Sequence, residues 1–303
     1  MSISFRDYPD IKSALDERSL NPQVRTAFQH ALRGREWLSC LDLGAGAGAS
    51  LWRLLNADLK ADLAITAVDP DRDLLELALR RLAVLLRARD FEVATPGPDH
   101  IQARRGGRSI SIEFVAAGPE DFNRQEPTRQ FDVVVAHHVT DLLPTQAMAD
   151  RIASWLKPQG VFYAALNYDT GTTVFPAYHD ADLEQRILAA YDAAMETRRM
   201  RDQPAEDAKP GGRLHGALLE SHLDILAQGA SDWNLTPLRR TYRDQDDLCL
   251  DAVLAHIRAE ADRSGGIGPH ALDSWHRDRR LEIDRRRLGL IVHQVDVLAQ
   301  RGA

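Results

Sequence analysis

The chain has 303 residues, of which 44% are hydrophobic, 27% charged and 6% aromatic, and its formal net charge is -7. This composition is typical of a globular protein with one elaborated domain or two small ones. No run approaches the roughly 18 apolar residues that a membrane-spanning helix needs. The acidic balance argues against bulk nucleic-acid binding. We therefore expect neither a membrane nor a nucleic acid as a partner.

Two further features bear on the compartment. The first ten residues contain acids and a proline where a signal peptide has an apolar stretch, which predicts no export. The two cysteines, Cys40 and Cys249, cannot form a disulfide framework, and no Cys/His cluster has the spacing of a zinc site. We expect a cytoplasmic protein without a resident metal.

Strands and helices alternate in the first half of the chain. The apolar stretch 38–43 predicts a strand, and residues 44–48 form a glycine-rich turn before a helix with apolar residues at helical spacing. The elements expected next are a strand over 61–68 and an amphipathic helix over 74–86. A hairpin-like elaboration within 91–116 leads into a third core strand near 110–115. A fourth strand over 131–136, a helix over 144–156 and a fifth strand over 160–166 follow. This alternation predicts right-handed crossovers and a parallel sheet.

The second half of the chain is more helical. The pattern predicts helices over 182–200, 214–223, 246–261 and 271–287, a polar loop over 201–212 and a strand within 224–236. The last apolar segment, 288–298, is rich in valine and isoleucine and favours a strand, with a helix as the alternative. No linker is long enough to separate two independent domains.

The most informative feature is the glycine turn. Gly44, Gly46 and Gly48 let the backbone adopt positive φ and let a ligand approach the main chain without a Cβ clash. Such a ligand lies at the C-terminal edge of an open α/β sheet. Taken as Gly44-x-Gly46-x-x-Ala49, the turn is a variant of the dinucleotide fingerprint, with Asp69 near the distance of a ribose-binding acid. The turn by itself fits more than one class of ligand.

More of the chain agrees with another family. Taken as Asp42-x-Gly44-x-Gly46-x-Gly48, the turn resembles motif I of the class I S-adenosylmethionine-dependent methyltransferases. The stretches similar to this family's successive motifs are CLDLGAGAGASLWRLL, ITAVDPD, FVAAGPEDF, FDVVVAHHVTDLL and LKPQGVFYAAL, which together cover about residues 38–167. The later NYD, SDW and LIVHQVDVLA resemble a bacterial, small-molecule-type subgroup.

The resemblance implies S-adenosylmethionine as cofactor and S-adenosylhomocysteine as product. It assigns the cofactor to Asp42, Gly44, Ala45, Gly46, Gly48, Asp69 and Pro70, with Asp69 on the ribose hydroxyls. The third motif of the family usually has an Asp directly after its strand to hold the adenine amino group. This chain has Gly118 and Pro119 there, so Glu120, Asp121 or backbone donors of the same turn take that role.

Methyl transfer from a sulfonium is an in-line displacement in which the protein aligns the acceptor and, where needed, removes its proton. His137 and His138 directly follow the fourth core strand and are candidate bases, because imidazole titrates near neutrality. Alternation allows at most one of them to face the ligand, and packing is the other interpretation. His137 is also a candidate cofactor contact. Asp169, at the end of the fifth strand, is a third candidate, as a base or as a contact for a cationic acceptor, and an ordinary turn aspartate is the other interpretation.

Four more residues are candidate substrate contacts: Asp141, Tyr168, Asp232 and Trp233. For Asp141 the alternative is a helix cap, and for Trp233 it is a core or lid residue. His293 has no partner at a recognisable spacing, and we interpret it as a structural histidine. The run Arg285 to Arg287 is interpreted as a helix end, where cations complement the helix dipole.

These observations combine into a prediction of one α/β domain over 1–303, with a Rossmann-like, doubly wound, mostly parallel seven-stranded sheet. Residues 1–36 form an N-terminal helical segment, 37–170 the cofactor-binding core, and 171–303 complete the core with helical cap insertions. The predicted function is methylation of a small-molecule acceptor by a monomer or homodimer. The alternatives are a non-catalytic S-adenosylmethionine-binding sensor or partner subunit and, less favoured, an NAD-dependent oxidoreductase.

Overall fold

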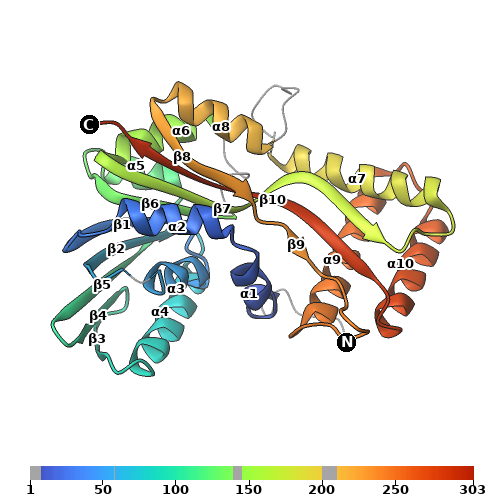
Figure 1. Cartoon of the computed structure of the whole chain (residues 1–303), viewed down its shortest axis with the longest axis horizontal. Coiled ribbons are helices and arrows are strands. Elements are labelled where there is room, and N and C mark those ends of the chain that lie inside the picture. The colour runs from blue at the N-terminus through green and yellow to red at the C-terminus, as the bar shows by residue number, and fades with distance from the viewer. Residues whose placement is uncertain (1–7, 58, 139–144, 200–209) are drawn as a thin grey trace. The chain divides into compact units, whose positions relative to one another are not determined.

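A computed structural model describes residues 8–57, 59–138, 145–199 and 210–303 (Figure 1). The helices are α1 (Tyr8–Ser19), α2 (Pro22–Ala31), α3 (Ala49–Leu55), α4 (Arg72–Arg87), α5 (Pro119–Gln125), α6 (Thr145–Trp155), α7 (Ala181–Arg199), α8 (Pro210–Glu220), α9 (Asp246–Ser264) and α10 (Pro269–Asp284). The strands are β1 (Trp37–Leu43), β2 (Asp62–Asp69), β3 (Glu92–Gly97), β4 (His100–Arg105), β5 (Arg108–Ala116), β6 (Phe131–His137), β7 (Leu156–Phe175), β8 (Leu223–Ala230), β9 (Trp233–Asn234) and β10 (Gly289–Arg301).

The chain divides into two compact units, each built from separate segments. The sheet unit comprises Asn21–Asn167, Gly211–Gly229 and Val295–Ala303, and the helical unit comprises Met1–Leu20, Tyr168–Pro210 and Ala230–Gln294. The unit boundary at 167/168 lies close to the predicted end of the cofactor-binding core at 170. The sheet unit also includes α2 and two later segments, so its composition differs from the predicted division of the chain. The assignment of residues 1–303 to a single domain stays a prediction.

The strands follow the order β3-β4-β5-β2-β1-β6-β7-β10-β8, with β9 paired to β10. Parallel pairing joins β5 to β2, β2 to β1, β1 to β6 and β6 to β7. The α/β fold class with a mostly parallel central sheet is therefore confirmed. The predicted count of seven strands is wrong, because the described residues alone form a sheet of ten. Seven strands run in a row from β5 to β8, and the additions are the antiparallel β3–β4 hairpin at the β5 edge and the short β9.

The sheet unit has helices on both faces of its strands. Figure 1 shows α5, α6 and α8 on one side and α3 and α4 on the other. Leu41 and Leu43 of β1 belong to the core with Trp155 of α6, while Asp42, between them in sequence, bonds a side chain of α3. Alternation along a strand directs successive side chains to opposite faces, which explains how one strand supplies both a core and a polar site.

The helical unit has a separate core. Its buried residues come from α1, α7, α9 and α10, from residues 168–175 of β7 and from β9 and β10. Within it the guanidinium of Arg279, with no exposed surface, meets the Glu184 carboxylate at 2.5 Å, and the Trp275 indole N–H donates to the same carboxylate at 2.9 Å. Since a buried charge needs a partner, this pair ties α7 to α10.

Several predicted elements change in extent. β7 continues to Phe175, beyond the predicted end at residue 166, and the predicted strand over 224–236 is interrupted between β8 and β9. The final segment is a strand, so the helical alternative for 288–298 is wrong. The predicted loop over 201–212 lies largely outside the described residues. No helix of the described ranges has the length and apolar character needed to cross a bilayer.

Candidate functional site

The glycine turn between β1 and α3 adopts the conformation that its sequence predicts. Gly44, Gly46 and Gly48 have φ values of 70°, 48° and 91°, in the region that glycine enters without steric cost. A Cβ at Gly48 would lie 3.1 Å from the Cβ of Ala78, so this glycine also lets the turn pack closely on α4. At Gly46 there is room for a Cβ, which would lie 4.0 Å from Oδ2 of Asp69.

Asp69 lies at the carboxyl end of β2, directly beside this turn. Its Oδ2 accepts the Gly46 N–H at 2.9 Å and its Oδ1 accepts the Asp71 N–H at 2.9 Å. The residue is 9% exposed. Two ionised carboxylate oxygens have about four acceptor positions, so these two bonds leave acceptor capacity for ligand hydroxyls. Asp69 and the glycine turn thus lie together, and their assignment to the cofactor stays a prediction.

Most of the turn's backbone donors are used within the protein. The N–H groups of Gly44 and Ala45 both donate to the Val68 carbonyl, at 2.8 and 3.1 Å, and the Gly48 N–H donates to the Ala45 carbonyl at 2.9 Å. With the Gly46 N–H on Asp69, all four of these donors make hydrogen bonds within the protein. A pyrophosphate site of the dinucleotide type presents such N–H groups to the phosphate oxygens.

Asp42 supplies a second carboxylate beneath the turn. It has no exposed surface, and its Oδ2 accepts the Ser50 hydroxyl at 2.6 Å. Its Oδ1 is buried and makes no hydrogen bond within the described part of the chain. Burial raises the pKa of Asp42 to about 7, while the Ser50 bond and the charge of Arg53 oppose that shift. An acceptor atom without a donor in a dry environment favours a ligand that brings a donor or a positive charge.

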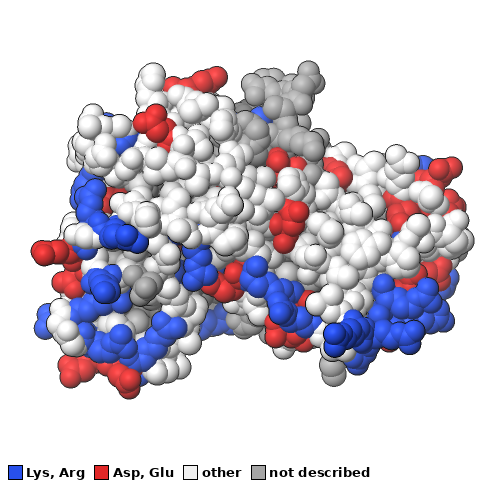
Figure 2. Space-filling view, viewed as in Figure 1, with Lys and Arg blue, Asp and Glu red and all other residues white. Residues whose placement is uncertain are grey.

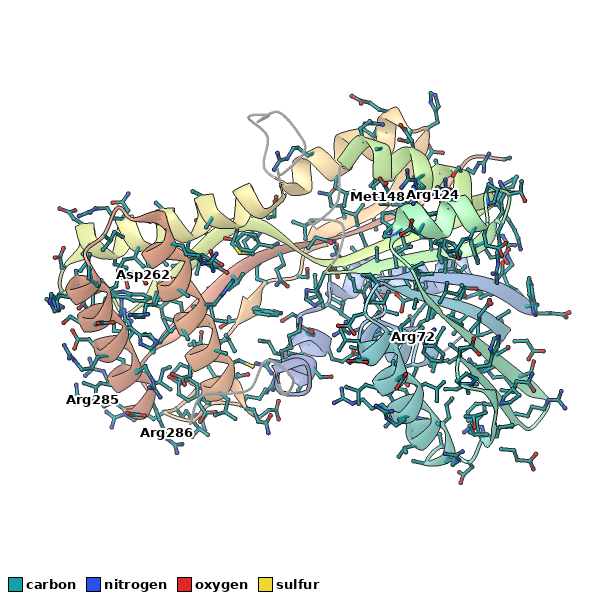
Figure 3. All side chains as sticks on the ribbon, turned by 180° about the vertical axis from the view of Figure 1, so that it is seen from behind. Arg72, Arg124, Met148, Asp262, Arg285 and Arg286 are labelled. Carbon is teal, nitrogen blue, oxygen red and sulfur yellow. The ribbon has the colours of Figure 1, made fainter. Side chains whose placement is uncertain are left out.

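The two carboxylates expected to hold adenine lie on the surface. Glu120 and Asp121 are in the first turn of α5, and both side chains are exposed. Glu120 lies 3.7 Å from Arg151, and Asp121 pairs with Arg124, which Figure 3 labels on this helix. Neither carboxylate is brought against Asp69 by these contacts. The adenine contact stays a prediction, and Pro70, which follows Asp69, is also exposed.

The two histidines after β6 differ in environment. His137 is 6% exposed, and its ring lies edge-on to Tyr163 at a centroid distance of 5.3 Å. Tyr163 in turn contacts Phe28, so His137 is part of an aromatic group. His138 is partly exposed, has a φ of 58° and donates its backbone N–H to the Ala165 carbonyl at 3.1 Å. A non-glycine residue at positive φ is uncommon, and such positions recur at functional sites.

The helical unit brings together two acids that the sequence separates widely. His293 of β10 places Nδ1 2.7 Å from Oδ1 of Asp232, and its Nε2 lies 3.8 Å from Oδ2 of Asp169. His293 therefore has acidic partners in space although no spacing in the sequence indicates them, and its interpretation as a structural histidine stays a prediction. Its two acids lie far from it along the chain, so sequence spacing gave no signal for them.

The other predicted substrate residues of the helical unit make hydrogen bonds and ring contacts within that unit. The Tyr168 hydroxyl donates to Asp192 at 2.5 Å, and burial with this carboxylate raises the pKa of Tyr168. The Trp233 indole donates to Asp16 at 3.0 Å, and the Lys12 ammonium lies 5.6 Å from its ring centroid. These contacts favour the structural interpretation of Trp233. Asp141 lies outside the described residues.

Asp296 is a buried residue of the sheet unit that the sequence analysis did not single out. One carboxylate oxygen accepts the Leu166 N–H at 2.8 Å and the other accepts the Asn21 N–H at 2.8 Å. It thereby fixes the end of the predicted fifth strand and the start of α2. The feature of the sequence that could have identified it is an acidic residue within the apolar run 288–298. Among the described residues, no group of three or more His, Cys, Asp or Glu is arranged to hold a metal ion.

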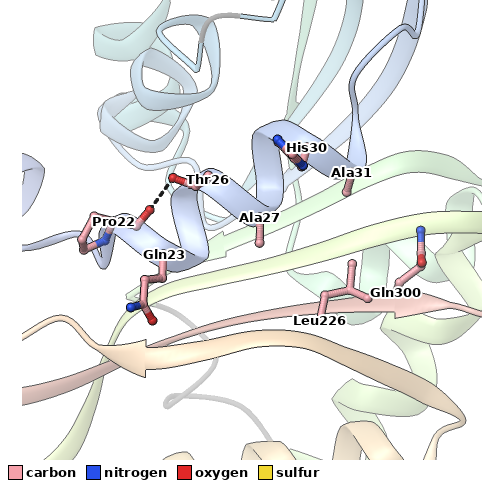
Figure 4. A pocket seen from close by; sticks show the side chains of 8 residues that line it. All are labelled: Pro22, Gln23, Thr26, Ala27, His30, Ala31, Leu226 and Gln300. Atoms are coloured by element: carbon pink, nitrogen blue, oxygen red, sulfur yellow. Dashed lines mark hydrogen bonds between the residues drawn. The ribbon is translucent and has the colours of Figure 1, made fainter.

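A separate groove of about 740 Å³ lies between α2 and the β8 and β10 strands of the sheet unit (Figure 4). Its lining residues are Pro22, Gln23, Thr26, Ala27, His30, Ala31, Leu226 and Gln300. The Thr26 hydroxyl donates to the Pro22 carbonyl of its own helix at 2.8 Å. None of the predicted site residues lines this groove, and it contains no carboxylate.

Comparison with protein families decides between the ligand classes left open by the turn. Residues 41–162, from within β1 to within β7, match the family model described as a methyltransferase domain. The chain carries a methyltransferase domain. The match confirms the predicted kinship with the class I S-adenosylmethionine-dependent methyltransferases, and S-adenosylmethionine is the cofactor of that class. No curated protein matches the chain.

Solved structures of similar fold are distant in sequence. A cyclopropane synthase from Mycobacterium tuberculosis is 13% identical with a TM-score of 0.46, over 92% of this chain and 83% of that chain. An S-adenosylmethionine-dependent methyltransferase from Thiobacillus denitrificans, solved with S-adenosylhomocysteine, is 14% identical with a TM-score of 0.43, over 99% of both chains. The methyltransferase from Geobacter sulfurreducens is also 14% identical, with a TM-score of 0.44 and 99% coverage of both chains. The assignment of the domain rests on the family model.

Proposed function

We propose that this methyltransferase transfers the methyl group of S-adenosylmethionine to a small-molecule acceptor by in-line displacement. The observation that carries the proposal is the pair of carboxylates at the glycine turn. Asp69 lies at the strand end, and Asp42 has a buried Oδ1 to which no donor of the described residues binds. S-adenosylmethionine has a ribose with two hydroxyls and an ammonium and a sulfonium with positive charge. The acidic turn complements such a ligand in both hydrogen bonding and charge.

In this proposal each part of the turn has a separate task. Asp69 accepts the ribose hydroxyls, while the Gly46 and Asp71 N–H groups hold its carboxylate in place. Gly44, Ala45, Gly46 and Gly48 form the surface on which the cofactor lies, and Asp42 provides negative charge below it. NAD is the poorer candidate, because its pyrophosphate would meet carboxylates and backbone donors already in use. When bound, the cofactor supplies an activated methyl group.

The protein's own contribution to the reaction is alignment and proton removal. Alignment of two reactants can contribute on the order of 7–11 kcal/mol to lowering a barrier. We assign the base to His138 in preference to His137, because His138 is partly exposed and held at positive φ, whereas His137 packs edge-on to Tyr163. A positioned base contributes about 10²–10⁴-fold in rate. Proton removal converts an ammonium group into a nucleophilic amine and makes a hydroxyl or thiol acceptor a better nucleophile.

The chemistry of the acceptor is the second part of the proposal. Asp169 and Asp232 converge on His293 and present negative charge in the helical unit. Two carboxylates against one imidazole favour an acceptor that is an amine or carries a cation nearby. The net charge of -7 also favours a small molecule over a nucleic acid.

Cofactor binding is tested by calorimetric titration of the whole protein with S-adenosylhomocysteine and, separately, with NAD. We expect S-adenosylhomocysteine to bind and NAD not to bind. Asp69→Asn should weaken binding at least tenfold, because it removes the charge that accepts the ribose hydroxyls. Asp73→Asn is the matched control, since Asp73 is an exposed acid of the neighbouring helix turn. NAD binding in place of S-adenosylhomocysteine would overturn the proposal.

Catalysis is tested by incubating the protein with methyl-labelled cofactor and fractionated small-molecule extract. We expect label in a low-molecular-weight fraction that is retained on a cation exchanger. His138→Gln should lower the turnover rate by about 10²-fold or more without changing the affinity for S-adenosylhomocysteine. His137→Gln serves as the comparison. Tight cofactor binding with no labelled product in any fraction would favour a sensor or partner subunit instead.

A further inference from the structure

An unusual turn lies in the helical unit between β9 and α9. Leu238 and Thr241 exchange both backbone hydrogen bonds, each 3.0 Å long, so Arg239 and Arg240 are the two central residues of a hairpin turn. Their φ values are 51° and 61°. Two positive φ values in a two-residue hairpin define a type I′ turn, a position for which Asn-Gly is strongly preferred. The chain has two arginines there instead.

A second arginine segment lies beside this turn. The Tyr242 hydroxyl donates to the Leu288 carbonyl at 2.8 Å, and the backbones of Leu235 and Leu290 bond to each other at 2.9 and 3.4 Å. These bonds place the turn alongside the end of α10, where Arg285, Arg286 and Arg287 follow one another. Figure 3 labels Arg285 and Arg286 at that end of the helix.

Arg286 repeats the feature seen in the turn. Its φ is 55°, and it directly follows the last helical turn, a position where helices commonly have glycine. An arginine-rich composition explains many arginines on a surface. It does not explain arginine at three left-handed positions, where an L-residue costs conformational energy. Left-handed backbone recurs at functional sites, and these arginines are three of the nine non-glycine residues that adopt it in the described part of the chain.

Exposed arginines outnumber exposed acids in this region. The six exposed arginines of what we call the arginine face are Arg239, Arg240, Arg243, Arg285, Arg286 and Arg287. None of the six takes part in an ion pair within the described chain, whereas Arg18 and Arg280 nearby do. Figure 2 shows Lys and Arg gathered over this part of the helical unit. Three exposed acids lie beside them, Asp247, Asp284 and Asp244. Of these, Asp244 pairs with Arg18.

Exposed leucines lie among these arginines. Leu238, which opens the turn, is 72% exposed, the highest value among the exposed large hydrophobic residues. Leu281 in the last turn of α10 and Leu248 in the first turn of α9 are also exposed, and the Arg280–Asp251 ion pair at 2.6 Å joins these two helix ends. Arginine next to protruding leucine fits a surface whose outer layer is anionic and whose interior is apolar.

We propose that the arginine face docks this protein on an anionic phospholipid surface, with Leu238 entering the headgroup region and the arginines binding lipid phosphates. Guanidinium groups suit phosphate oxygens because they donate in pairs. A nucleic acid would use the arginines and leave the leucines exposed to water. This docking is peripheral and independent of the proposed methyl transfer, and it departs from the expectation that a membrane is not a partner. Since the whole chain is acidic, the attraction is local, and added salt should weaken it.

The test is co-sedimentation of the full-length protein with phosphatidylcholine vesicles that contain or lack phosphatidylglycerol. We expect binding to the anionic vesicles alone, and less binding as salt is added. The central variant is Arg239→Asn with Arg240→Gly, which removes two charges while installing the preferred residues of a type I′ turn. The partition coefficient onto anionic vesicles should fall by about 30-fold, because each of the two removed arginines contributes to binding at an anionic surface. Its thermal stability should equal or exceed that of the wild type.

Two further variants sharpen the result. Leu238→Ser keeps every charge and should weaken partitioning by about tenfold, because it removes the apolar contact. Arg80→Gln with Arg104→Gln removes the same charge from exposed positions of the sheet unit and should leave binding unchanged. Equal binding by the wild type and the turn variant, or no binding by the wild type, overturns the proposal. So does binding that is unaffected by Leu238→Ser and displaced by RNA, which would identify a nucleic-acid surface.

Discussion

The two compact units each bury a carboxylate, but they treat its charge differently. In the helical unit Glu184 accepts four hydrogen bonds, of 2.5 to 2.9 Å, from Arg279 and Trp275, so its charge is matched inside the core. In the sheet unit Asp42 has the Ser50 hydroxyl on one oxygen and no hydrogen bond on the other within the described residues. The Glu184 carboxylate therefore has its donors within the protein, whereas Oδ1 of Asp42 can still accept a hydrogen bond from a ligand.

This difference connects stability with function. A matched buried pair fixes the geometry of a core, although an apolar pair of similar size can be equally stable. An unmatched carboxylate costs stability whenever it is ionised, and that cost is recovered only when a donor or cation binds. Ionisation of Asp42 therefore lowers the stability of the sheet unit at the glycine turn, where the cofactor is proposed to lie. Ionised Glu184 has no such cost, because Arg279 matches its charge.

The largest effect is expected from breaking the matched pair. Arg279→Met leaves Glu184 buried and without its cation, so we expect the free energy of unfolding to fall by about 3–5 kcal/mol. Urea denaturation followed by tryptophan fluorescence measures this, since Trp275 contacts the same carboxylate. The control is Arg258→Gln, because the exposed pair of Arg258 with Asp273 should contribute about 1 kcal/mol or less.

A double variant separates charge from packing in that core. Arg279→Met combined with Glu184→Met removes both charges and should recover most of the stability lost by the single change. If Arg279→Met alone costs no more than the exposed control, the pair does not stabilise the helical unit. In that case Glu184 and Asp42 would not differ in the way that the contrast between the two units requires.

The next effect concerns the ionisation of Asp42. Burial raises the pKa of Asp42 to about 7 in the folded protein, from 3.8 for the ordinary carboxyl. Between these pH values the folded state binds more protons than the unfolded state, so stability falls as the pH rises from about 4 to about 7 and levels off above. Asp42→Asn removes this dependence and should be the more stable protein above pH 7, by a few kcal/mol at about 1.4 per pKa unit.

The same variant should bind the cofactor product less well. A cationic ammonium favours the ionised form of Asp42, so the affinity of the wild type for S-adenosylhomocysteine should rise as the pH passes through about 7. In Asp42→Asn this rise should disappear. Calorimetric titrations and urea denaturation over the same pH series measure both effects. A variant that is equally stable and binds equally well at all pH values would show that Asp42 has neither role.

The sequence predicted the sheet unit well because its signals are local. Strand ends, glycine positions and helix spacing between residues 38 and 166 each depend on neighbours a few residues apart. The same local pattern located Asp42, Asp69 and the glycine turn. For Glu120 and Asp121 the local pattern gave no direction for the side chains, which the structure pairs with Arg151 and Arg124.

The helical unit was harder to predict because its contacts join distant segments. His293 meets Asp232 across an interval of 61 residues and Glu184 meets Arg279 across 95, and no spacing rule connects such positions. The strand count failed for a related reason. A short strand such as β9 forms only because β10 provides its partner, and β7 extends beyond its apolar core into a polar stretch. Pairing of this kind depends on tertiary structure.

The smallest effect on stability, and the sharpest on binding, comes from comparing two glycines of the sheet unit. Gly46 and Gly34 have φ values of 48° and 78°, and an added Cβ has room at both. Alanine should therefore cost each about 1 kcal/mol of stability. Only at Gly46 does the new methyl group lie beside Asp69, 4.0 Å from Oδ2, on the surface proposed to hold the cofactor. We expect Gly46→Ala to weaken S-adenosylhomocysteine binding at least tenfold and Gly34→Ala to leave it unchanged. Equal loss in both would trace the effect to backbone strain, and no loss in either would move the cofactor away from the turn.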